Sequence, residues 1–306
     1  MQEIAPEGQR ILVTGGAGFI GSHLVDALVE NNDVRVLDNL STGQRDNVHS
    51  EATLVEGDIR DGETLETALS DIDLVFHEAA QVSVQRSVEV PEKSFEINTR
   101  PTLQILERAR TDDIRVILAS SCAIYGDPDY VPIDEEHPPS PSSPYGLEKL
   151  TIDRYARLYN DLYGVETVAL RYFNVYGPRQ TAGDYSGVIS IFVDQATEGD
   201  DITVEGDGEQ TRDFVHVDDV VRANLLAART DAVGEAFNIG TGSSVTIREL
   251  SDMIQEVAKS NSDIVHVDPR SGDIGESRAE IDKAQTKLGF DPRTTLREGL
   301  ESLIDE

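Results

Sequence analysis

The chain has 306 residues, 38% of them hydrophobic, and its 58 acidic and 26 basic residues give a formal net charge of −32. This length allows one large domain or two of ordinary size with a real core, and the negative charge argues against nucleic acid or an anionic membrane as a partner. No apolar run is long enough to span a membrane, no secretory signal is recognisable, and the single cysteine, Cys122, excludes an internal disulfide. We therefore expect a globular cytoplasmic protein.

The first predicted elements are a short β-branched strand over Arg10–Thr14, a glycine-rich turn and a helix that begins near Phe19. Glycines at three-residue spacing allow a tight turn and let a pyrophosphate approach bare backbone, while the helix start offers free N–H groups to an anion. An ordinary strand–turn–helix connection has the same pattern, so the turn needs support from its context. The residues expected to hold the cofactor phosphates are Gly15, Gly18, Phe19, Ile20 and Gly21.

Acidic residues mark the ends of the next two predicted strands. The second strand ends in Asp38, about 20 residues after the glycines, where a carboxylate accepts a hydrogen bond from a ribose 2′-hydroxyl and repels a 2′-phosphate. We therefore predict NAD rather than NADP as the cofactor, with Asn39 beside it. A third strand is predicted over Thr53–Arg60, and its Asp58 and Ile59 border the expected adenine site.

Short strands and helices continue to alternate, which predicts a parallel, doubly wound α/β sheet. A helix is expected over Glu63–Leu69, a fourth strand over Leu74–His77 and a further helix over Phe95–Ala109. Small residues after the fourth strand would let the backbone pass close to the cofactor. The candidate cofactor contacts in this part of the chain are Ala79, Ala80, Gln81 and Asn98.

A hydroxyl at a strand end precedes a tyrosine–lysine pair on the next helix. The fifth strand, Val116–Ser121, ends in Ser121, and ligands of such sheets lie beyond the carboxyl ends of the strands. A helix opens at Pro144, and Tyr145 and Lys149 share one face of it because they stand four residues apart. An ammonium and a positive nicotinamide ring favour the phenolate of Tyr145, which could then act as a base. Such a pair also arises by chance, but its place behind a dinucleotide fingerprint makes these three residues the catalytic candidates.

Eight motifs spread along the chain carry a resemblance to a known family. They are Thr14–Gly21, Leu37–Asn39, Gly57–Arg60, His77–Gln81, Ser120–Gly126, Pro144–Lys149, Arg171–Gln180 and Arg212–Asp219. Together they resemble the extended short-chain dehydrogenases/reductases and, within them, the nucleotide-sugar epimerases of the UDP-glucose 4-epimerase type. The resemblance covers nearly the whole chain and is highly specific for the superfamily, and moderately specific for the epimerases among its members.

The resemblance implies a fold and an activity. It implies a Rossmann-type NAD-binding domain over residues 1–173 and a smaller, mixed α/β substrate domain over residues 174–306, with a segment of about residues 213–242 that returns to the first domain. It also implies that the protein inverts C4 of a UDP-hexose through a transient 4-keto sugar, with NAD returned to its starting state. A homodimer is the assembly that the family resemblance suggests.

Most of the substrate contacts are implied by the resemblance alone. Val188, Ile189, Thr203 and Glu205 are similar to walls of the family's uridine pocket, while Arg212 and Arg270 resemble its diphosphate-binding arginines. The remaining implied contacts are Asn174 on the diphosphate or sugar, Ser121 and Tyr145 on the reacting sugar, Ser277 at the pocket gate, and Lys149 and Phe173 on the cofactor.

The motifs also allow other activities that occur on the same fold. In the dehydratases of this superfamily a glutamate stands two places after the strand-end hydroxyl, whereas Ser121 is followed here by Cys122 and Ala123, which speaks against a 4,6-dehydratase. A UDP-glucuronate 4-epimerase is also compatible with the motifs, whereas the intact Ser121, Tyr145 and Lys149 speak against a non-catalytic NAD-binding regulator. The small side chain of Ser277 makes UDP-GlcNAc and UDP-GalNAc plausible substrates alongside UDP-Glc and UDP-Gal.

Two compositional features complete the sequence-based expectations. The chain has only five lysines, and acid-rich, lysine-poor surfaces are similar to those of proteins from salt-loving cells, where high ionic strength screens self-repulsion. An acidic, well-solvated protein of a different source would have the same composition. The six histidines are scattered without metal-ligand spacing, so no metal is predicted.

Overall fold

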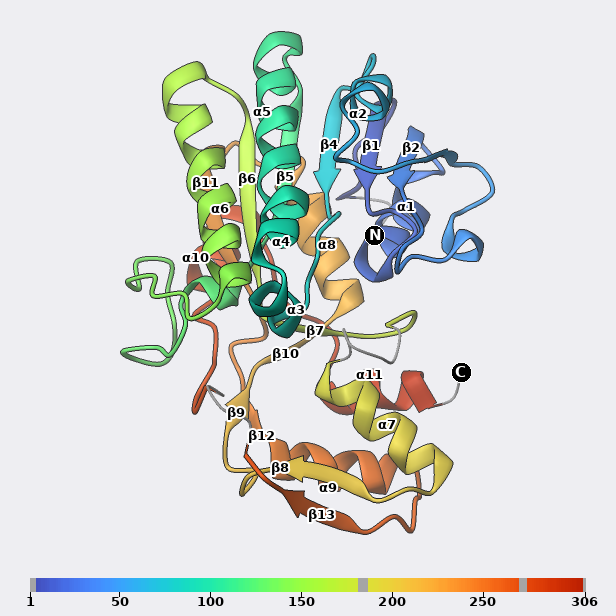
Figure 1. Cartoon of the computed structure of the whole chain (residues 1–306), viewed down its shortest axis with the longest axis vertical. Helices are drawn as coiled ribbons and strands as arrows, with labels where there is room; N and C mark the ends of the chain where they lie inside the picture. The colour runs from blue at the N-terminus through green and yellow to red at the C-terminus, as the bar shows by residue number, and fades with distance from the viewer. Residues whose placement is uncertain (1–3, 181–186, 270–273, 305–306) are drawn as a thin grey trace.

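The computed structural model describes residues 4–180, 187–269 and 274–304, which form a larger and a smaller lobe (Figure 1). The strands are β1 (Arg10–Thr14), β2 (Asp33–Asp38), β3 (Thr53–Glu56), β4 (Leu74–His77), β5 (Arg115–Ser121), β6 (Thr167–Tyr172), β7 (Asn174–Tyr176), β8 (Ile202–Glu205), β9 (Thr211–Arg212), β10 (Phe214–His216), β11 (Glu235–Ile239), β12 (Val245–Thr246) and β13 (Ile264–Val267). The helices are α1 (Phe19–Leu28), α2 (Gly62–Ala68), α3 (Val84–Glu89), α4 (Pro91–Asn98), α5 (Arg100–Asp112), α6 (Pro144–Tyr163), α7 (Val188–Glu198), α8 (Val217–Ala227), α9 (Ile247–Val257), α10 (Asp282–Leu288) and α11 (Leu296–Ile304), with short 3₁₀ turns at Arg45–Asn47 and Cys122–Ile124.

The larger lobe is built on a seven-stranded sheet in the order β11-β6-β5-β4-β1-β2-β3, in which every pairing is parallel. Because parallel strands need crossover connections, helices cover both faces of the sheet. The predicted doubly wound α/β fold is confirmed.

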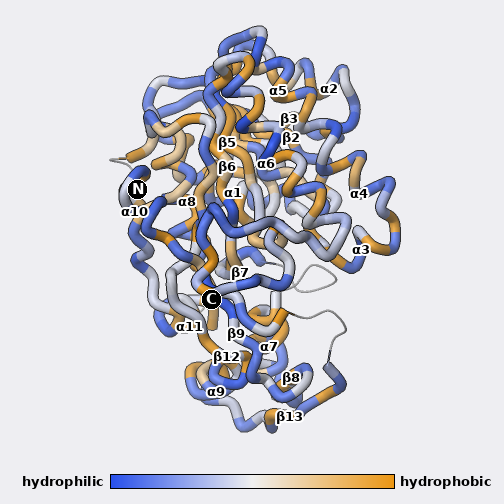
Figure 2. Tube along the Cα trace, turned by 90° about the vertical axis from the view of Figure 1, so that its left-hand side faces the viewer, coloured by the Kyte–Doolittle hydropathy of each residue, from blue (hydrophilic) through white to orange (hydrophobic). Residues whose placement is uncertain are grey.

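Alternating side chains of the strands fill two separate apolar layers. Ile11 and Val13 of β1 pack into the layer that contains residues of α1 and α8, while Leu12 points into the layer with residues of α5 and α6. The period of two follows from the pleat of the strand, and burial on both faces explains why the strands are almost entirely apolar. Figure 2 shows this hydrophobic centre within a hydrophilic surface.

The smaller lobe has a core of its own, made by residues of α7, α9 and α11 with β8. Helix α9 is amphipathic and starts at a capping box, in which Thr246 accepts from the Glu249 N–H and the Glu249 carboxylate accepts from the Thr246 N–H. Before this helix, the chain returns to the sheet of the larger lobe, where β11 pairs with β6. The two lobes are therefore interleaved along the chain.

Two predicted elements differ from the observed ones. The helix expected over Phe95–Ala109 consists of α4 and α5, which are separated at Thr99, because Pro101 in the first turn of α5 lacks the N–H that a continuous helix would need. The third strand, expected to reach Arg60, ends at Glu56. The next residues form a turn in which the Asp58 carboxylate accepts from the Arg60 N–H.

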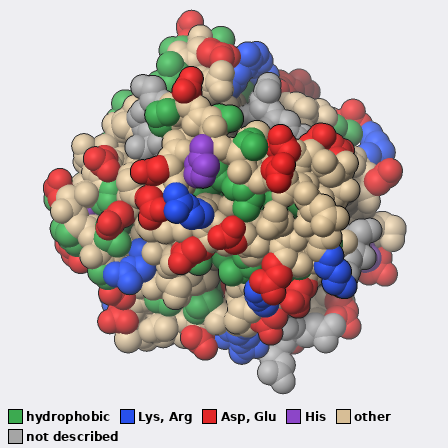
Figure 3. Space-filling view, turned by 90° about the horizontal axis from the view of Figure 1, so that it is seen from below, with side chains coloured by type: hydrophobic (Ala, Val, Ile, Leu, Met, Phe, Trp, Pro, Cys, Tyr) green, Lys and Arg blue, Asp and Glu red, His purple; other side chains and the backbone are tan. Residues whose placement is uncertain are grey.

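On the face of the smaller lobe that Figure 3 shows, acidic and basic side chains are dispersed rather than gathered in one patch. Among the described residues, none of the helices combines the length and the apolar composition that a membrane span requires. Within the same residues, no group of three or more histidine, cysteine or acidic side chains is arranged to bind a metal ion.

Candidate active site

A cavity of about 930 Å³ lies at the carboxyl ends of β1, β2 and β4 and extends to the smaller lobe. Strand β1 lies between β4 and β2, so the strand order reverses there, and doubly wound sheets bind their ligands at this switch point. The cavity brings together predicted residues from both halves of the chain, namely Gly15, Gly18, Phe19, Ile20, Gly21, Asp38, Asn39, Asp58, Ile59, Ala79, Ala80, Gln81, Asn174, Val188, Thr203, Glu205 and Arg212.

The other described candidates stand outside the cavity lining. Ile189 and Phe173 are buried in apolar clusters of the smaller lobe and of the β5–α6 region, respectively. Ser277 is buried and donates its N–H to the Thr211 carbonyl at 3.1 Å, next to the cavity residue Arg212. The predicted contact Arg270 lies outside the described residues. Asn98, Ser121, Tyr145 and Lys149 are considered below.

The glycine turn has the close backbone packing that a phosphate site needs. Gly15 has φ +71°, and a Cβ on Gly21 would stand 2.2 Å from the Gly15 carbonyl oxygen, so a side chain at Gly21 would displace the turn. Helix α1 starts directly after it, and the N-cap Gly18 provides no side-chain cap, which leaves N–H groups of the first turn for an anion. The turn therefore fits a dinucleotide pyrophosphate.

Asp38 is fixed at the end of β2 by the backbone around it. Its carboxylate accepts from the Ala17 N–H at 3.0 Å and from the Leu40 N–H at 2.8 Å, and only 8% of the residue is exposed. Each oxygen retains a second lone pair, which a ribose hydroxyl could use. Nearby, Asn39 donates to the Asp58 carboxylate at 3.1 Å, and the hydrogen bonds from Arg60 lower the pKa of Asp58.

The segment after β4 passes close to the glycine turn. A Cβ on Gly15 would stand 2.8 Å from the Ala79 nitrogen, and the Ala79 N–H donates to the Thr14 hydroxyl at 3.3 Å. Asn98 fixes the same segment from behind, because its amide accepts from the Gln81 N–H at 2.7 Å and donates to the Gln81 carbonyl at 3.0 Å. Asn98 therefore supports the cofactor-facing segment in this structure.

The three catalytic candidates meet at the end of β5. Helix α6 starts at Pro144, where the Ser143 hydroxyl accepts from the Gly146 N–H, and this start places Tyr145 in the first turn. Ser121 lies beside the Tyr145 hydroxyl and favours its ionised form. One turn later, the Lys149 ammonium donates to the Ala119 carbonyl at 2.7 Å and lies 5.8 Å from the centre of the Tyr145 ring.

Burial shifts both titratable members of this set. It raises the pKa of Tyr145 to about 12, against the opposing effect of the hydrogen bond from Ser121. Burial also lowers the pKa of Lys149 to about 8, although the nearby Glu78 and Glu148 counteract it. Without a further positive charge the tyrosine is neutral at physiological pH, so its function as a base depends on what binds beside it.

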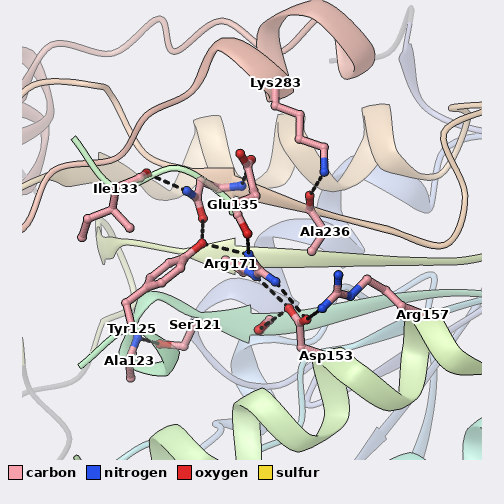
Figure 4. A network of polar contacts seen from close by, with 12 residues as sticks. Ser121, Ala123, Tyr125, Ile133, Glu135, Asp153, Arg157, Arg171, Ala236 and Lys283 are labelled. Atoms are coloured by element: carbon pink, nitrogen blue, oxygen red, sulfur yellow. Dashed lines mark hydrogen bonds and ion pairs between the residues drawn. The ribbon is translucent and has the colours of Figure 1, made fainter. Parts of the chain in front are cut away.

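A buried polar network supports this part of α6 (Figure 4). Asp153, which follows Lys149 by one turn, forms a two-pronged ion pair with Arg171 of β6, at 2.8 and 3.0 Å, and neither side chain is more than 3% exposed. The Ser120 hydroxyl donates to the same carboxylate at 3.3 Å, and Arg171 also donates to the Tyr125 hydroxyl at 2.9 Å. The helix that carries the tyrosine and lysine is thereby attached to β5 and β6.

The cavity lining is far less negative than the chain. Among the described residues it contains five basic side chains, on Arg60, Arg86, Lys93, Arg179 and Arg212, and four acidic ones, on Asp38, Asp58, Glu78 and Glu205. The chain has a net charge of −32, so this near-balance of charge in the cavity lowers the electrostatic repulsion that a negatively charged nucleotide diphosphate meets there.

Several lining residues were not predicted from the sequence as site residues. Arg60, Glu78 and Arg179 belong to three of the eight motifs, so their positions in those motifs were a usable signal. Arg86 and Lys93 come from α3 and α4, and only the packing of these helices beside the cavity brings them to it.

Comparisons with known proteins identify the family to which the chain belongs. The sequence profile of the NAD dependent epimerase/dehydratase family matches residues 11–240. A protein of Methanocaldococcus jannaschii is 46% identical over 299 residues, which cover 96% of this chain and 97% of that protein. The UDP-glucose 4-epimerase of Thermotoga maritima, solved with UDP-glucose, superposes with a TM-score of 0.94 at 42% identity and 97% coverage of both chains.

A third match concerns a different sugar. The UDP-N-acetylglucosamine 4-epimerase of Methanobrevibacter ruminantium, solved with UDP-N-acetylmuramic acid, has a TM-score of 0.93 at 38% identity and covers 98% of this chain and 99% of its own. The two solved structures cover 97% and 98% of this chain, so these matches include both lobes. On these findings, the chain belongs to the NAD dependent epimerase/dehydratase family.

Proposed function

We propose that this protein is an NAD-dependent epimerase that inverts C4 of a UDP-hexose through a transient 4-keto sugar. The observation that carries the proposal is the meeting of Ser121, Tyr145 and Lys149 at the end of β5, next to the segment that starts at Glu78 and lines the cavity. The similarity to epimerases that act on UDP-glucose and UDP-N-acetylglucosamine supports it.

In this proposal the two lobes bind different ligands. We assign residues 1–173 with about 213–242 to NAD and the rest of 174–306 mainly to the UDP-sugar. Gly15, Gly18 and Gly21 would approach the pyrophosphate of NAD, and Asp38 its ribose. Arg212, Thr203 and Val188 line the same cavity from the smaller lobe, where they would bind the diphosphate and uridine.

NAD, when bound in the cavity, would supply the redox chemistry of the reaction, namely a reversible hydride transfer with C4 of the sugar. Tyr145, as phenolate, takes the proton of the 4-hydroxyl, and Ser121 hydrogen-bonds the same sugar oxygen. Lys149 stabilises the phenolate with its positive charge. Tyr145 then gives the proton back after the 4-keto sugar has turned over in the cavity, so no proton or hydride is gained or lost overall.

The second candidate function is another reaction of the same family on a nucleotide sugar, such as a 4,6-dehydratase. Water elimination needs an additional acid beside the sugar, and Cys122 and Ala123 occupy the positions after Ser121. Burial raises the pKa of the Cys122 thiol to about 11, which makes it a poor proton donor. The geometry therefore favours epimerisation.

We also propose a homodimer through α4 and α6. Large apolar side chains on these helices are exposed, namely Phe95 (51%), Leu147 (56%), Leu158 (45%), Leu162 (61%) and Tyr163 (52%). Neighbouring helices with several exposed apolar residues are typical of an interface. The measured mass in solution tests this assembly, and a cytoplasmic location stays a prediction from the sequence.

One assay tests the proposed reaction. The protein is incubated at high salt with NAD and, separately, with UDP-Gal, UDP-GalNAc and UDP-GlcA, and the products are resolved. We expect the C4 epimer of UDP-Gal and, because Ser277 is small, of UDP-GalNAc. A dehydrated sugar, or a keto sugar released into solution, would favour the second candidate. No reaction with any of the three would contradict the proposal.

A further inference from the structure

Glu78 is a titratable residue of the cavity lining to which the proposed reaction gives no role. It follows β4 directly, and its N–H donates to the Thr14 carbonyl of β1 at 3.2 Å. In the sheet, His77 pairs with Leu118, so Glu78 stands level with Ala119 on the neighbouring strand. The Ala119 carbonyl accepts the hydrogen bond from Lys149, and adjacent strands are about 4.8 Å apart. Glu78 is therefore close to the catalytic ammonium.

A chain of hydrogen bonds holds the Glu78 carboxyl group in place. The Tyr172 hydroxyl donates to it at 2.9 Å, and the Asn224 amide of α8 donates to the Tyr172 oxygen at 2.7 Å. Because Asn224 uses a lone pair of the tyrosine oxygen, the tyrosine proton is directed toward Glu78. Tyr172, the middle member of this chain of hydrogen bonds, pairs in the sheet with Ser121 of the neighbouring strand β5.

The charged and titratable neighbours of Glu78 come from several elements. Lys149 and Tyr145 stand on α6, Tyr172 on β6 and His77 on β4 itself. Glu148 of α6 acts on the same Lys149 and Tyr145. Burial lowers the pKa of His77 to about 3, so this ring is neutral. Burial raises the pKa of Glu78 to about 7, against the effects of Tyr172 and Lys149, so its charge changes in the physiological range.

We propose that Glu78 is a positioning residue of the epimerase reaction, whose carboxylate keeps the Lys149 ammonium charged and opposes the Tyr145 phenolate, and which thereby sets the pH range of activity. This inference rests on the proposed function. A negative charge favours the protonated form of every neighbour, so it favours the active form of Lys149 and the inactive form of Tyr145. Glu78 thus extends activity on the alkaline side.

The test compares the pH dependence of kcat and KM for the unaltered protein and for Glu78→Gln. Removal of the negative charge lowers the pKa of both Lys149 and Tyr145. The alkaline limb, where Lys149 loses its proton, should move to lower pH by about 0.5–1 unit. The acid limb of the profile, where Tyr145 gains its proton, should move less, because Glu78 is itself protonated and uncharged at that pH. KM should stay within a factor of about two, because Glu78 does not hold the nucleotide.

Two further variants make the test specific. Tyr172→Phe keeps the carboxylate but removes its hydrogen bond, so Glu78 is charged less often and the alkaline limb should move in the same direction by a smaller amount. Glu256→Gln, an exposed position of α9 in the smaller lobe, should leave the profile unchanged. If Glu78→Gln does not fold, the Tyr172→Phe profile still decides the matter.

A spectroscopic titration separates this inference from the proposed function. The absorbance of ionised tyrosine in the NAD complex, with a Tyr145→Phe protein as the blank, reports the Tyr145 phenolate without any sugar substrate. Glu78→Gln should shift this titration to lower pH. An alkaline limb and a phenolate titration that both stay in place, or move to higher pH, would overturn the inference, even in a protein with full epimerase activity. Conversely, a shifted titration in a protein without epimerase activity would contradict the proposed function alone.

Discussion

At the scale of single residues, the site depends on a tyrosine whose ordinary chemistry is unsuited to its task. Burial raises the pKa of Tyr145 to about 12, which opposes the phenolate. Ser121 offsets this effect only in part. The Lys149 ammonium lies 5.8 Å from the centre of the ring. A bound nicotinamide ring would add a positive charge at the same place, so the base becomes available when the cofactor is present.

The substitution Tyr145→Phe should lower kcat by about 10²–10⁴-fold, because it removes the group that takes and returns the proton. The ring remains, so the packing of α6 should be preserved. Bound NAD and the far-ultraviolet circular dichroism spectrum should match those of the unaltered protein. A variant that keeps full activity would eliminate Tyr145 as the base.

The sequence predicted best the positions of candidate residues that follow from local spacing. Asp38 and the pair Tyr145 and Lys149 stand at fixed distances from a strand end or from each other. The contact between Glu78 and Tyr172 had no such signal, because the two residues are 94 positions apart in the chain and only the completed sheet brings them together. The same holds for Lys93, which reaches the cavity through the packing of α4.

At the scale of secondary structure elements, the turn between β1 and α1 combines fold and function. A Cβ on Gly21 would collide with the Gly15 carbonyl at 2.2 Å. We expect Gly21→Ala to lower the free energy of unfolding by about 1–3 kcal/mol and to weaken NAD binding, because the turn must open. Chemical denaturation and NAD titration measure the two effects.

Gly62→Ala is the matched control for this substitution, because nothing lies within 4 Å of a Cβ built there and its φ is not positive. Gly62 is the first residue of α2, and alanine has a higher helix propensity than glycine. Its unfolding free energy and its NAD affinity should therefore be unchanged or slightly higher. If Gly21→Ala behaved like this control, the close approach of the turn to its helix would not matter.

The attachment of α6 depends on a buried ion pair. Asp153→Asn would leave Arg171 buried without its charged partner, and we expect a loss of about 3–5 kcal/mol in the free energy of unfolding. Asp161→Asn, at an exposed position of the same helix, should change stability by less than about 0.5 kcal/mol. Equal effects of the two substitutions in urea unfolding would refute a structural role for the pair.

The order and type of the elements in the sheet were predictable because both faces of the strands are buried, which leaves short apolar runs between turns. The boundaries were less predictable. The break between α4 and α5 at Thr99 depends on Pro101, and the early end of β3 depends on the turn around Asp58. In both cases a local hydrogen-bonding constraint overrides the longer periodic pattern.

At the scale of the whole molecule, the excess of acidic residues dominates the behaviour in solution. A net charge of −32 repels itself in the compact state, and salt shortens the range of this repulsion from about 10 Å at 0.1 M to about 3 Å at 1 M. We therefore expect the melting temperature to rise with the concentration of KCl between these limits. A melting temperature that stays constant or falls over the same range would argue against a protein adapted to high salt.

The resemblance implied that a segment of about residues 213–242 returns to the first domain, and in the structure β11 (Glu235–Ile239) pairs with β6 of the seven-stranded sheet. The cavity between the two lobes could not be predicted from the sequence, because its lining comes from segments as distant in the chain as the glycine turn and β13. This shared cavity is what makes an internal redox cycle physically reasonable, since the cofactor and the sugar would meet within it.

The most direct measurement of this cycle follows one hydrogen atom. UDP-Gal that contains deuterium at C4 is converted in ordinary water, and the UDP-Glc formed is examined by mass spectrometry and nuclear magnetic resonance. Because the same hydride is removed and returned, we predict that the deuterium is retained at C4 of the inverted product. A product that has lost the deuterium to solvent, or an inverted sugar with the label at another carbon, would contradict the mechanism.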